Sequence, residues 1–331
     1  MSTHIDSPQS KLDRSFDSII NFRDVGRTIN HIAGKKLLKE GVLFRSARLD
    51  EASEEDIRLL TCDLHVSTII DLRSTTEHQM ATTKHRKSHP PLSESPEEEQ
   101  RPREQIGPEA YIHLPALDDS KTRRHLISLT GRAFEKRLLW QLDWWNFTKV
   151  LAYLAAGWRH DAVRIVGENV MKPAGLTGIA KDSLEASTAE VKEVFEILAS
   201  PFSPPSTDAD ANSDAASSPA VLIHCTQGKD RTGTVILLLL LLTGAVDGDT
   251  IAREYVLSEK ELENEPAEEK AQRMREIRAL GLDKDYTLCP KDYTQRITDF
   301  LDEKYGGVQG YLESVGVEKA VIERVRARFL A

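Results

Sequence analysis

The sequence predicts an α/β protein with a central sheet of about four or five strands, flanked by helices on both sides. Three observations favour this class. Four short apolar segments have the length of strands. Segments with apolar residues at helical spacing lie between and after them. Residues 66–72 (VSTIIDL) do not alternate regularly between apolar and polar side chains, which is typical of a sheet covered on both faces.

The predicted strands are short and rich in apolar and β-branched residues. They are residues 41–47 (GVLFRSA), 66–72, 111–117 (YIHLPAL) and 220–225 (AVLIHC). A short helix is expected between the first two strands. Ser53 can cap this helix, and Asp56 supplies the carboxylate expected three residues later in a capping box.

A helical insertion is predicted at about residues 120–200. Residues 131–171 hold all 4 tryptophans of the chain, with apolar positions recurring at helical spacing. Residues 187–199 (STAEVKEVFEILA) form a further amphipathic helix. The tryptophans are interpreted first as the core of a helical layer, because apolar stripes on helices usually face a core.

Two segments are predicted to be unstructured inserts within a single domain that spans residues 1–331. Residues 82–109 are charged and Pro-rich, and residues 201–219 are rich in Pro, Ser, Ala and Asp. Neither segment has enough large apolar side chains to offset the entropy lost on ordering. They are interpreted as loops of one domain because the strands on either side still need partners.

Composition and charge argue against several classes of protein. The net charge of −9 argues against nucleic-acid binding through bulk charge. The 3 cysteines, Cys62, Cys225 and Cys289, include no close pair and predict no disulfide framework. The first residues lack the apolar segment of a secretory signal, and the longest apolar run, residues 235–242, is far shorter than the about 20 residues that span a bilayer. A cytoplasmic location is expected, with a nuclear one possible and peripheral membrane contact left open.

The residues that indicate a chemical activity lie in one segment. Residues 224–234 (HCTQGKDRTGT) place Cys225 between a predicted strand and an apolar run that predicts a helix. A free thiol has a pKa of about 8.5, and the unpaired N–H groups at a helix N-terminus favour the thiolate. Gly228 permits a turn that a residue with a Cβ atom resists. The amides of residues 226–231 can then converge on an anion, and Arg231 adds a planar fork of donors matched to phosphate.

This arrangement suits in-line attack on phosphorus, because phosphoryl transfer depends mostly on positioning and charge stabilisation. A phosphocysteine would form on Cys225 and water would then hydrolyse it. Thr232 could donate a hydrogen bond to the sulfur. No metal or other cofactor is expected, since the segment contains neither CxxC nor HxxxH spacing. The residues predicted to bind the substrate phosphate are Thr226, Gln227, Gly228, Lys229, Asp230, Arg231 and Thr232.

The same residues resemble a known family. His224, Cys225 and, after five residues, the Arg-Thr-Gly that begins at Arg231 are similar to the signature of Cys-based protein tyrosine phosphatases. The Lys-Asp pair before the arginine resembles the atypical tyrosine/serine, lipid-phosphatase-like branch of fungi and bacteria. The resemblance implies a tyrosine-phosphatase-like fold. Further stretches similar to that branch are NFRDVG (21–26), LFRSA (43–47), IIDLRSTTE (69–77) and YGGVQGYLESVGV (305–317).

Two carboxylates are candidates for the general acid. Asp230 either points away and holds the loop, or is protonated and donates to the leaving oxygen, and the resemblance favours a catalytic role. Asp118 follows the predicted strand 111–117, where the superfamily carries its usual acid on a separate loop. The Trp-Pro-Asp pattern of the best-known members is missing there. Lys229 either adds positive charge at the edge of the pocket, as in lipid phosphatases of the superfamily, or is a solvated surface residue.

The remaining candidates are given supporting roles. Asp/Arg pairs near strand ends are more often structural ion pairs than catalytic groups. The tryptophan-rich insertion has two functional alternatives to a core: a lid over the cysteine, as in bacterial relatives, or a surface for lipid. Cys62 and Cys289 are interpreted as structural or incidental, and the functional alternative is a disulfide between either thiol and Cys225. The residues assigned to the supporting shell are Arg23, Asp24, Arg45, Asp71 and Arg73.

The sequence therefore predicts a phosphomonoester hydrolase, with phosphotyrosine-containing protein as the first-choice substrate. A phosphoinositide or inositol phosphate is the alternative within the same chemistry. A noncatalytic phosphate-binding module is a different class, against which the intact Cys225 and Arg231 argue. Sulfur or arsenate chemistry of the rhodanese type also uses a cysteine after a strand, but the Arg-Thr-Gly ending fits phosphate better.

Overall fold

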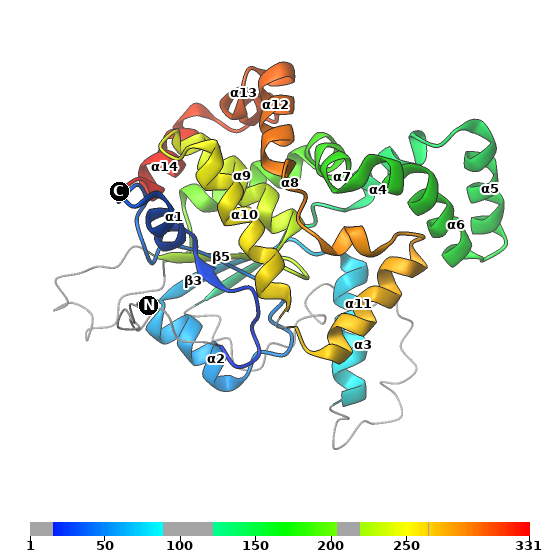
Figure 1. Cartoon of the computed structure of the whole chain (residues 1–331), viewed down its shortest axis with the longest axis horizontal. Coiled ribbons are helices and arrows are strands. Elements are labelled where there is room, and N and C mark those ends of the chain that lie inside the picture. The colour runs from blue at the N-terminus through cyan, green and yellow to red at the C-terminus, as the bar shows by residue number, and fades with distance from the viewer. Residues whose placement is uncertain (1–15, 89–121, 204–218, 264) are drawn as a thin grey trace, which may run out of the picture.

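The computed structural model describes residues 16–88, 122–203, 219–263 and 265–331, which form a sheet surrounded by helices (Figure 1). The strands are β1 (Arg23–Asp24), β2 (Leu43–Ser46), β3 (Val66–Asp71), β4 (Arg123–Leu126) and β5 (Ala220–His224). The helices before β5 are α1 (Val25–Ala33), α2 (Glu54–Arg58), η2 (Leu59–Asp63), α3 (Thr75–Ser88), α4 (Arg132–Trp140), α5 (Trp144–Ala155), α6 (Arg159–Val166), η5 (Gly167–Met171), α7 (Lys172–Ala186) and α8 (Thr188–Ala199). The helices after β5 are α9 (Asp230–Thr243), α10 (Gly248–Glu263), α11 (Ala267–Ala279), η7 (Lys284–Thr287), α12 (Tyr293–Tyr305), α13 (Val308–Ser314) and α14 (Lys319–Phe329).

The strands of the described residues form one mixed sheet in the order β1-β2-β5-β3-β4. β2, β5, β3 and β4 run parallel, and β1 pairs with β2 in the antiparallel direction. The strands predicted at residues 41–47, 66–72 and 220–225 contain β2, β3 and β5, and the α/β class is confirmed. The strand predicted at residues 111–117 lies outside the described residues.

Two strands were not predicted, and both lie at an edge of the sheet. β1 has only two residues, and β4 (RRHL) has no apolar run. β4 is positioned by its pairing with β3, where Ile70 lies opposite His125. An edge strand takes its hydrogen bonds from a neighbour and often carries charged side chains, so hydrophobic patterning does not reveal it.

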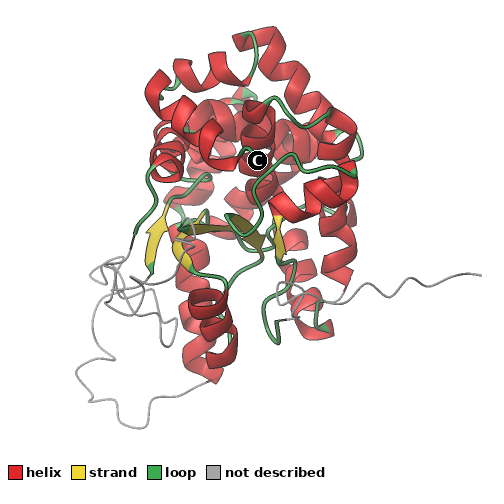
Figure 2. Cartoon of the chain, turned by 90° about the vertical axis from the view of Figure 1, so that its left-hand side faces the viewer, coloured by secondary structure: helices red, strands yellow, loops and turns green. Residues whose placement is uncertain are grey.

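The three inner strands of the sheet, β2, β5 and β3, bury apolar residues in two separate cores. In β5, Val221 and Ile223 pack into the larger core, whereas Ala220 and Leu222 pack into a smaller one completed by α2 and η2. Most of the helices lie on the side of the larger core (Figure 2). Its central helix is α9, whose residues 235–240 are all buried. No helix among the described residues is both long and apolar enough to cross a lipid bilayer.

The C-terminal half of α3 contradicts part of one prediction. Residues 82–88, predicted to be unstructured, continue helix α3. The hydroxyls of Thr82 and Thr83 donate to the carbonyls one turn earlier, and a helix satisfies its own backbone groups without burying a long apolar face. The remaining residues of this predicted insert and residues 204–218 of the other lie outside the described part of the chain.

The helices α4, α5 and α6, here called the helical arm (residues 132–166), overturn the interpretation of the tryptophans as core residues. Trp140, Trp144, Trp145 and Trp158 are 70%, 78%, 66% and 58% exposed. The arm extends to the edge of the molecule opposite the C-terminus (Figure 1). Within α5 only Val150 is buried, because α5 packs mainly on α6, which packs in turn on η5, rather than on the sheet.

The close approach of α1 to the segment before β2 gives a testable prediction. A Cβ atom at Gly26 would lie 2.1 Å from the carbonyl oxygen of Lys39, whereas a Cβ atom at Gly248 of α10 meets open space. Both glycines are in helices, where alanine is normally favoured. We expect Gly26→Ala to lower the free energy of unfolding by about 1–3 kcal/mol, as overpacking does. Gly248→Ala should change it by less than about 1 kcal/mol. Urea unfolding measures both, and equal changes would contradict the predicted steric cost.

Candidate active site

The cysteine loop, as residues 225–231 are called here, runs from the end of β5 into the first turn of α9, at the carboxyl end of the parallel strands. Cys225 is 2% exposed, and the backbone N–H of Gly228 donates to its Sγ over 3.2 Å. Gly228 has a φ of +65°, and a Cβ atom there would lie 2.1 Å from the carbonyl oxygen of Ser46 in β2. Glycine is therefore required at this position both for the turn and for the approach of the loop to the sheet.

Side chains of other elements hold the carbonyl groups of the loop through hydrogen bonds. Asn21 donates from Nδ2 to the carbonyl of Gln227 over 2.8 Å, and Arg45 donates from Nη2 to the carbonyl of Gly228 over 2.6 Å. In a planar trans peptide the N–H points opposite to the C=O. These two contacts therefore turn the next N–H groups, those of Gly228 and Lys229, away from the supporting side chains. The loop is shaped to present amides to an anion at Cys225.

A buried carboxylate holds the arginine that supports the loop. Glu254 of α10 accepts from Nη1 of Arg45 over 3.0 and 2.7 Å, and from Nε of Arg23 over 2.8 Å. Burial by itself would raise the pKa of Glu254, but the charges of Arg23 and Arg45 outweigh it and lower the pKa. Ser258, one turn later on α10, accepts from Arg23 as well. Arg23 and Arg45 thus lie in the supporting shell, while Asp24 caps α1 by accepting from the N–H of Arg27.

Arg231 is held by a residue that sequence analysis did not single out. Its Nη1 and Nη2 each donate to one carboxylate oxygen of Glu77 over 2.6 Å. The hydroxyl of Thr226 also donates to Glu77, so one carboxylate joins both ends of the cysteine loop. Burial would raise the pKa of Glu77, but the charge and hydrogen bonds of Arg231 hold it well below its usual range. Glu77 ends the stretch IIDLRSTTE, and a carboxylate near the start of a helix was the available signal.

A second buried network supports the strand ends beside the cysteine. Asp71 is fully buried and accepts from Arg73 over 3.0 Å and from Arg124. Arg73 also pairs with Asp50, with Nη1 and Oδ2 2.5 Å apart. Burial lowers the pKa of His224 to about 4, although Asp71 opposes that shift, so the imidazole is neutral near pH 7. A neutral His224 adds no positive charge next to Cys225.

The structure places the predicted site residues unequally. Lys229 does not line the edge of the pocket, because its side chain is fully buried and its Nζ donates to the carbonyls of Tyr286 and Leu288 over 3.3 and 2.7 Å. The ammonium also lies 3.1 Å from Oδ1 of Asp230, whose side chain is 36% exposed. Asp118 lies outside the described residues.

Two further polar groups, one in the cysteine loop and one directly after it, lack partners. Thr232 Oγ1 and Gln227 Oε1 are buried and make no hydrogen bond within the described part of the chain. The hydroxyl of Thr232 therefore makes no hydrogen bond to the sulfur of Cys225 in this structure. A buried hydroxyl without a partner costs free energy, and an anion bound in the loop is one group that could satisfy it.

The chemistry available to the site is that of a thiol under backbone amides, beside a guanidinium. Cys62, Cys225 and Cys289 are free thiols, with Cys62 exposed and Cys289 buried. Burial raises the pKa of Cys289 to about 11, so this thiol is not an activated nucleophile. The described residues contain no group of three His, Cys, Asp or Glu side chains placed to hold a metal ion.

Comparison with known proteins places the chain in a family. A tyrosine-protein phosphatase of Nostoc commune is 34% identical over 114 residues, which cover 33% of this chain and 38% of that protein. A triple specificity protein phosphatase PtpB of Mycobacterium tuberculosis is 31% identical over 128 residues, covering 33% of this chain and 44% of that protein. The chain thus matches less than half the length of these two relatives. A family model described as "Tyrosine phosphatase family" matches residues 14–331, and this protein therefore belongs to the tyrosine phosphatase family.

Proposed function

We propose that this protein hydrolyses phosphomonoesters through a phosphocysteine intermediate, with phosphotyrosine-containing protein as its substrate. The observation that carries the proposal is the contact between the Gly228 N–H and Cys225 Sγ, with Arg231 in the same loop. An amide aimed at a buried thiol stabilises negative charge, first on the sulfur and then on phosphate oxygens. Membership of the tyrosine phosphatase family supports the same chemistry.

The proposed reaction has two steps. In the first, the thiolate of Cys225 attacks phosphorus, the bond to the ester oxygen breaks, and an acid protonates the leaving oxygen. In the second, water attacks phosphorus, the sulfur leaves as thiolate, and inorganic phosphate is released. The loop amides and Arg231 bind the phosphate oxygens in both steps. No metal is needed for this sequence of bonds, because the charge is carried by the amides and one guanidinium.

Several points of the proposal stay open to experiment. A phosphoinositide or inositol phosphate is the alternative substrate, and the burial of the Lys229 ammonium removes one reason to favour it. A noncatalytic phosphate-binding module would use the same loop without turnover. Sulfur or arsenate chemistry would not need the fork of donors that Arg231 supplies.

We place the activity in a single domain and expect a cytoplasmic location. A phosphate-release assay with phosphotyrosine peptide, phosphoserine peptide and phosphoinositide substrates distinguishes the substrate classes.

The role of the nucleophile is tested by Cys225→Ser. We expect turnover of para-nitrophenyl phosphate to fall about 10³-fold or more, because an alcohol ionises far less readily than a thiol. Vanadate binding should persist, since the loop amides remain. Cys62→Ser is the matched control, because Cys62 is exposed and free, and it should retain full activity. Substantial activity in Cys225→Ser would overturn the proposed mechanism.

The contact between Glu77 and Arg231 gives a second test. Gln keeps the shape of the side chain at position 77 but loses the charge that orients the guanidinium. We expect Glu77→Gln to lower kcat about 10- to 100-fold with a smaller change in KM, because a misplaced arginine stabilises the transition state less. Glu196→Gln, on the exposed surface of α8, is the control and should be unchanged. If Glu77→Gln instead bound vanadate more tightly at unchanged kcat, Glu77 would be a competitor of phosphate rather than a positioning residue.

The general acid is tested by comparing Asp230→Asn with Asp118→Asn. If Asp230 donates the proton, its substitution should lower kcat about 100-fold with a phosphotyrosine peptide and much less with para-nitrophenyl phosphate, whose leaving group needs little protonation. Asp118→Asn should then be mild. The high-pH limb of the kcat profile should flatten in the variant that lost the acid. We favour Asp230 because it lies in the cysteine loop. Small, equal effects of both substitutions would exclude both residues as the acid.

A further inference from the structure

The helical arm exposes an aromatic and aliphatic surface that the active site does not use. Trp144, Phe147, Leu151 and Leu154 follow one another on α5 at spacings of three, four and three residues, which places them on one face of the helix. Leu151 and Leu154 are 49% and 45% exposed, and Trp144 is the most exposed tryptophan of the arm. Trp140 of α4 extends this face, because its ring stacks on Phe147 with ring centres 5.7 Å apart.

The opposite side of α5, which carries Trp145 and Lys149, also combines aromatic rings with positive charge. The ammonium of Lys149 lies 5.3 Å from the ring centre of Trp145, one helical turn earlier on α5. In such a pair the ring is apolar and the ammonium is charged, a combination that suits the boundary between acyl chains and headgroups. Trp158 lies at the start of α6, where its ring packs against Tyr153. Tryptophan is enriched at membrane–water interfaces for the same reason.

The charge of the arm differs in sign from that of the chain. Between residues 132 and 166 there are six Lys and Arg against three Asp and Glu, whereas the whole chain has a net charge of −9. Arg137 and Arg164 form ion pairs, and the other four cations form none within the described part of the chain: Arg132, Lys136, Lys149 and Arg159. A positive, aromatic surface on an otherwise acidic protein complements an anionic surface.

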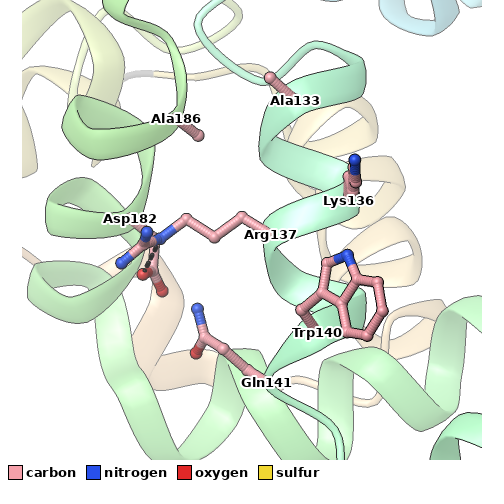
Figure 3. Close-up of a pocket in the computed structure, with 7 residues that line it drawn as sticks. All are labelled: Ala133, Lys136, Arg137, Trp140, Gln141, Asp182 and Ala186. Carbon is pink, nitrogen blue, oxygen red and sulfur yellow. Dashed lines mark hydrogen bonds and ion pairs between the residues drawn. The ribbon is translucent and has the colours of Figure 1, made fainter.

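A cavity of about 570 Å³ adjoins Trp140 between α4 and α7 (Figure 3). Arg137 extends across it to Asp182, over 2.6 Å, and also pairs with Glu185, so its charge is compensated. Lys136 also lines this cavity and is left with an uncompensated charge. The hollow therefore offers an anionic headgroup one free ammonium next to the aromatic face.

From these observations we propose that the helical arm docks on an anionic lipid bilayer. The face of Trp144, Leu151 and Leu154 enters the boundary of the acyl chains, and Lys136 and Arg159 contact lipid phosphates. The arm is joined directly to the active site, because α4 begins two residues after Thr130, whose hydroxyl lies 3.5 Å from Nη1 of Arg231. Docking holds the cysteine loop near the bilayer without covering it. This inference does not depend on the proposed phosphatase activity.

The experiment uses the full-length protein and its own fluorescence, since all 4 tryptophans of the chain lie in or beside the arm. Vesicles of phosphatidylcholine with about one third phosphatidylserine should shift the emission to shorter wavelength and sediment the protein. Vesicles of phosphatidylcholine alone should do neither. The double variant Trp144→Ser with Leu151→Ser, and separately the double variant Lys136→Glu with Arg159→Glu, should each reduce the fraction bound at least about tenfold.

Controls separate this inference from folding and from the phosphatase proposal. Val256→Ser replaces an exposed aliphatic residue of α10 outside the arm and should bind vesicles like the unchanged protein. Hydrolysis of soluble para-nitrophenyl phosphate should be the same in the arm variants as in the unchanged protein, which also reports correct folding. Absence of binding to anionic vesicles, or equal binding to neutral ones, overturns the proposal. So does a vesicle-independent shift that depends on protein concentration and accompanies dimers in sedimentation equilibrium, because a second copy would then cover the face.

Discussion

The buried contact between Arg45 and Glu254 is the constraint on which the geometry of the site depends. Arg45 is fully buried, and it uses one nitrogen for Glu254 and the other for the carbonyl of Gly228. A buried ion pair gains little net stability, because desolvation offsets the attraction, but removing one partner leaves a charge buried alone. This pair therefore serves position more than stability. It connects β2 and α10 to the loop and sets the direction of the Gly228 peptide, which in turn aims the next amide.

The positive potential of the site comes from backbone amides rather than from an excess of cationic side chains. Arg231 is paired with Glu77, Lys229 is bound to carbonyls and to Asp230, and His224 is neutral near pH 7. A substrate dianion would bring negative charge into a loop whose described cations already have partners. The amides at the loop and at the start of α9 then supply most of the attraction. Such dipoles are fixed before the substrate binds and need no reorganisation.

The apolar residues of two regions of the chain differ in their exposure to solvent. The sheet and α9 bury their apolar residues almost completely, whereas the helical arm leaves its tryptophans in water. A stripe of apolar residues at helical spacing means only that the helix has an apolar face. Whether another part of the same chain covers that face is decided by how the helix is connected and what it packs against. In the arm, α5 turns back on α6 and η5, so its apolar stripe stays exposed.

The sequence by itself determined the α/β class, three strands of the sheet and the placement of Cys225, Gly228 and Arg231 on one loop. These features depend on residues close together in the chain: apolar runs make β3 and β5, Ser53 and Asp56 cap α2 as expected, and the glycine and arginine follow the cysteine at short range. Only the tertiary structure decided which carboxylates hold the arginines. Glu77 lies 154 residues from Arg231, and Glu254 lies 209 residues from Arg45. Which distant residues become partners depends on how strands and helices pack, and no local sequence pattern predicts it. The same holds for β4, which is a strand because β3 pairs with it, and for the tryptophans, whose exposure follows from packing rather than from spacing.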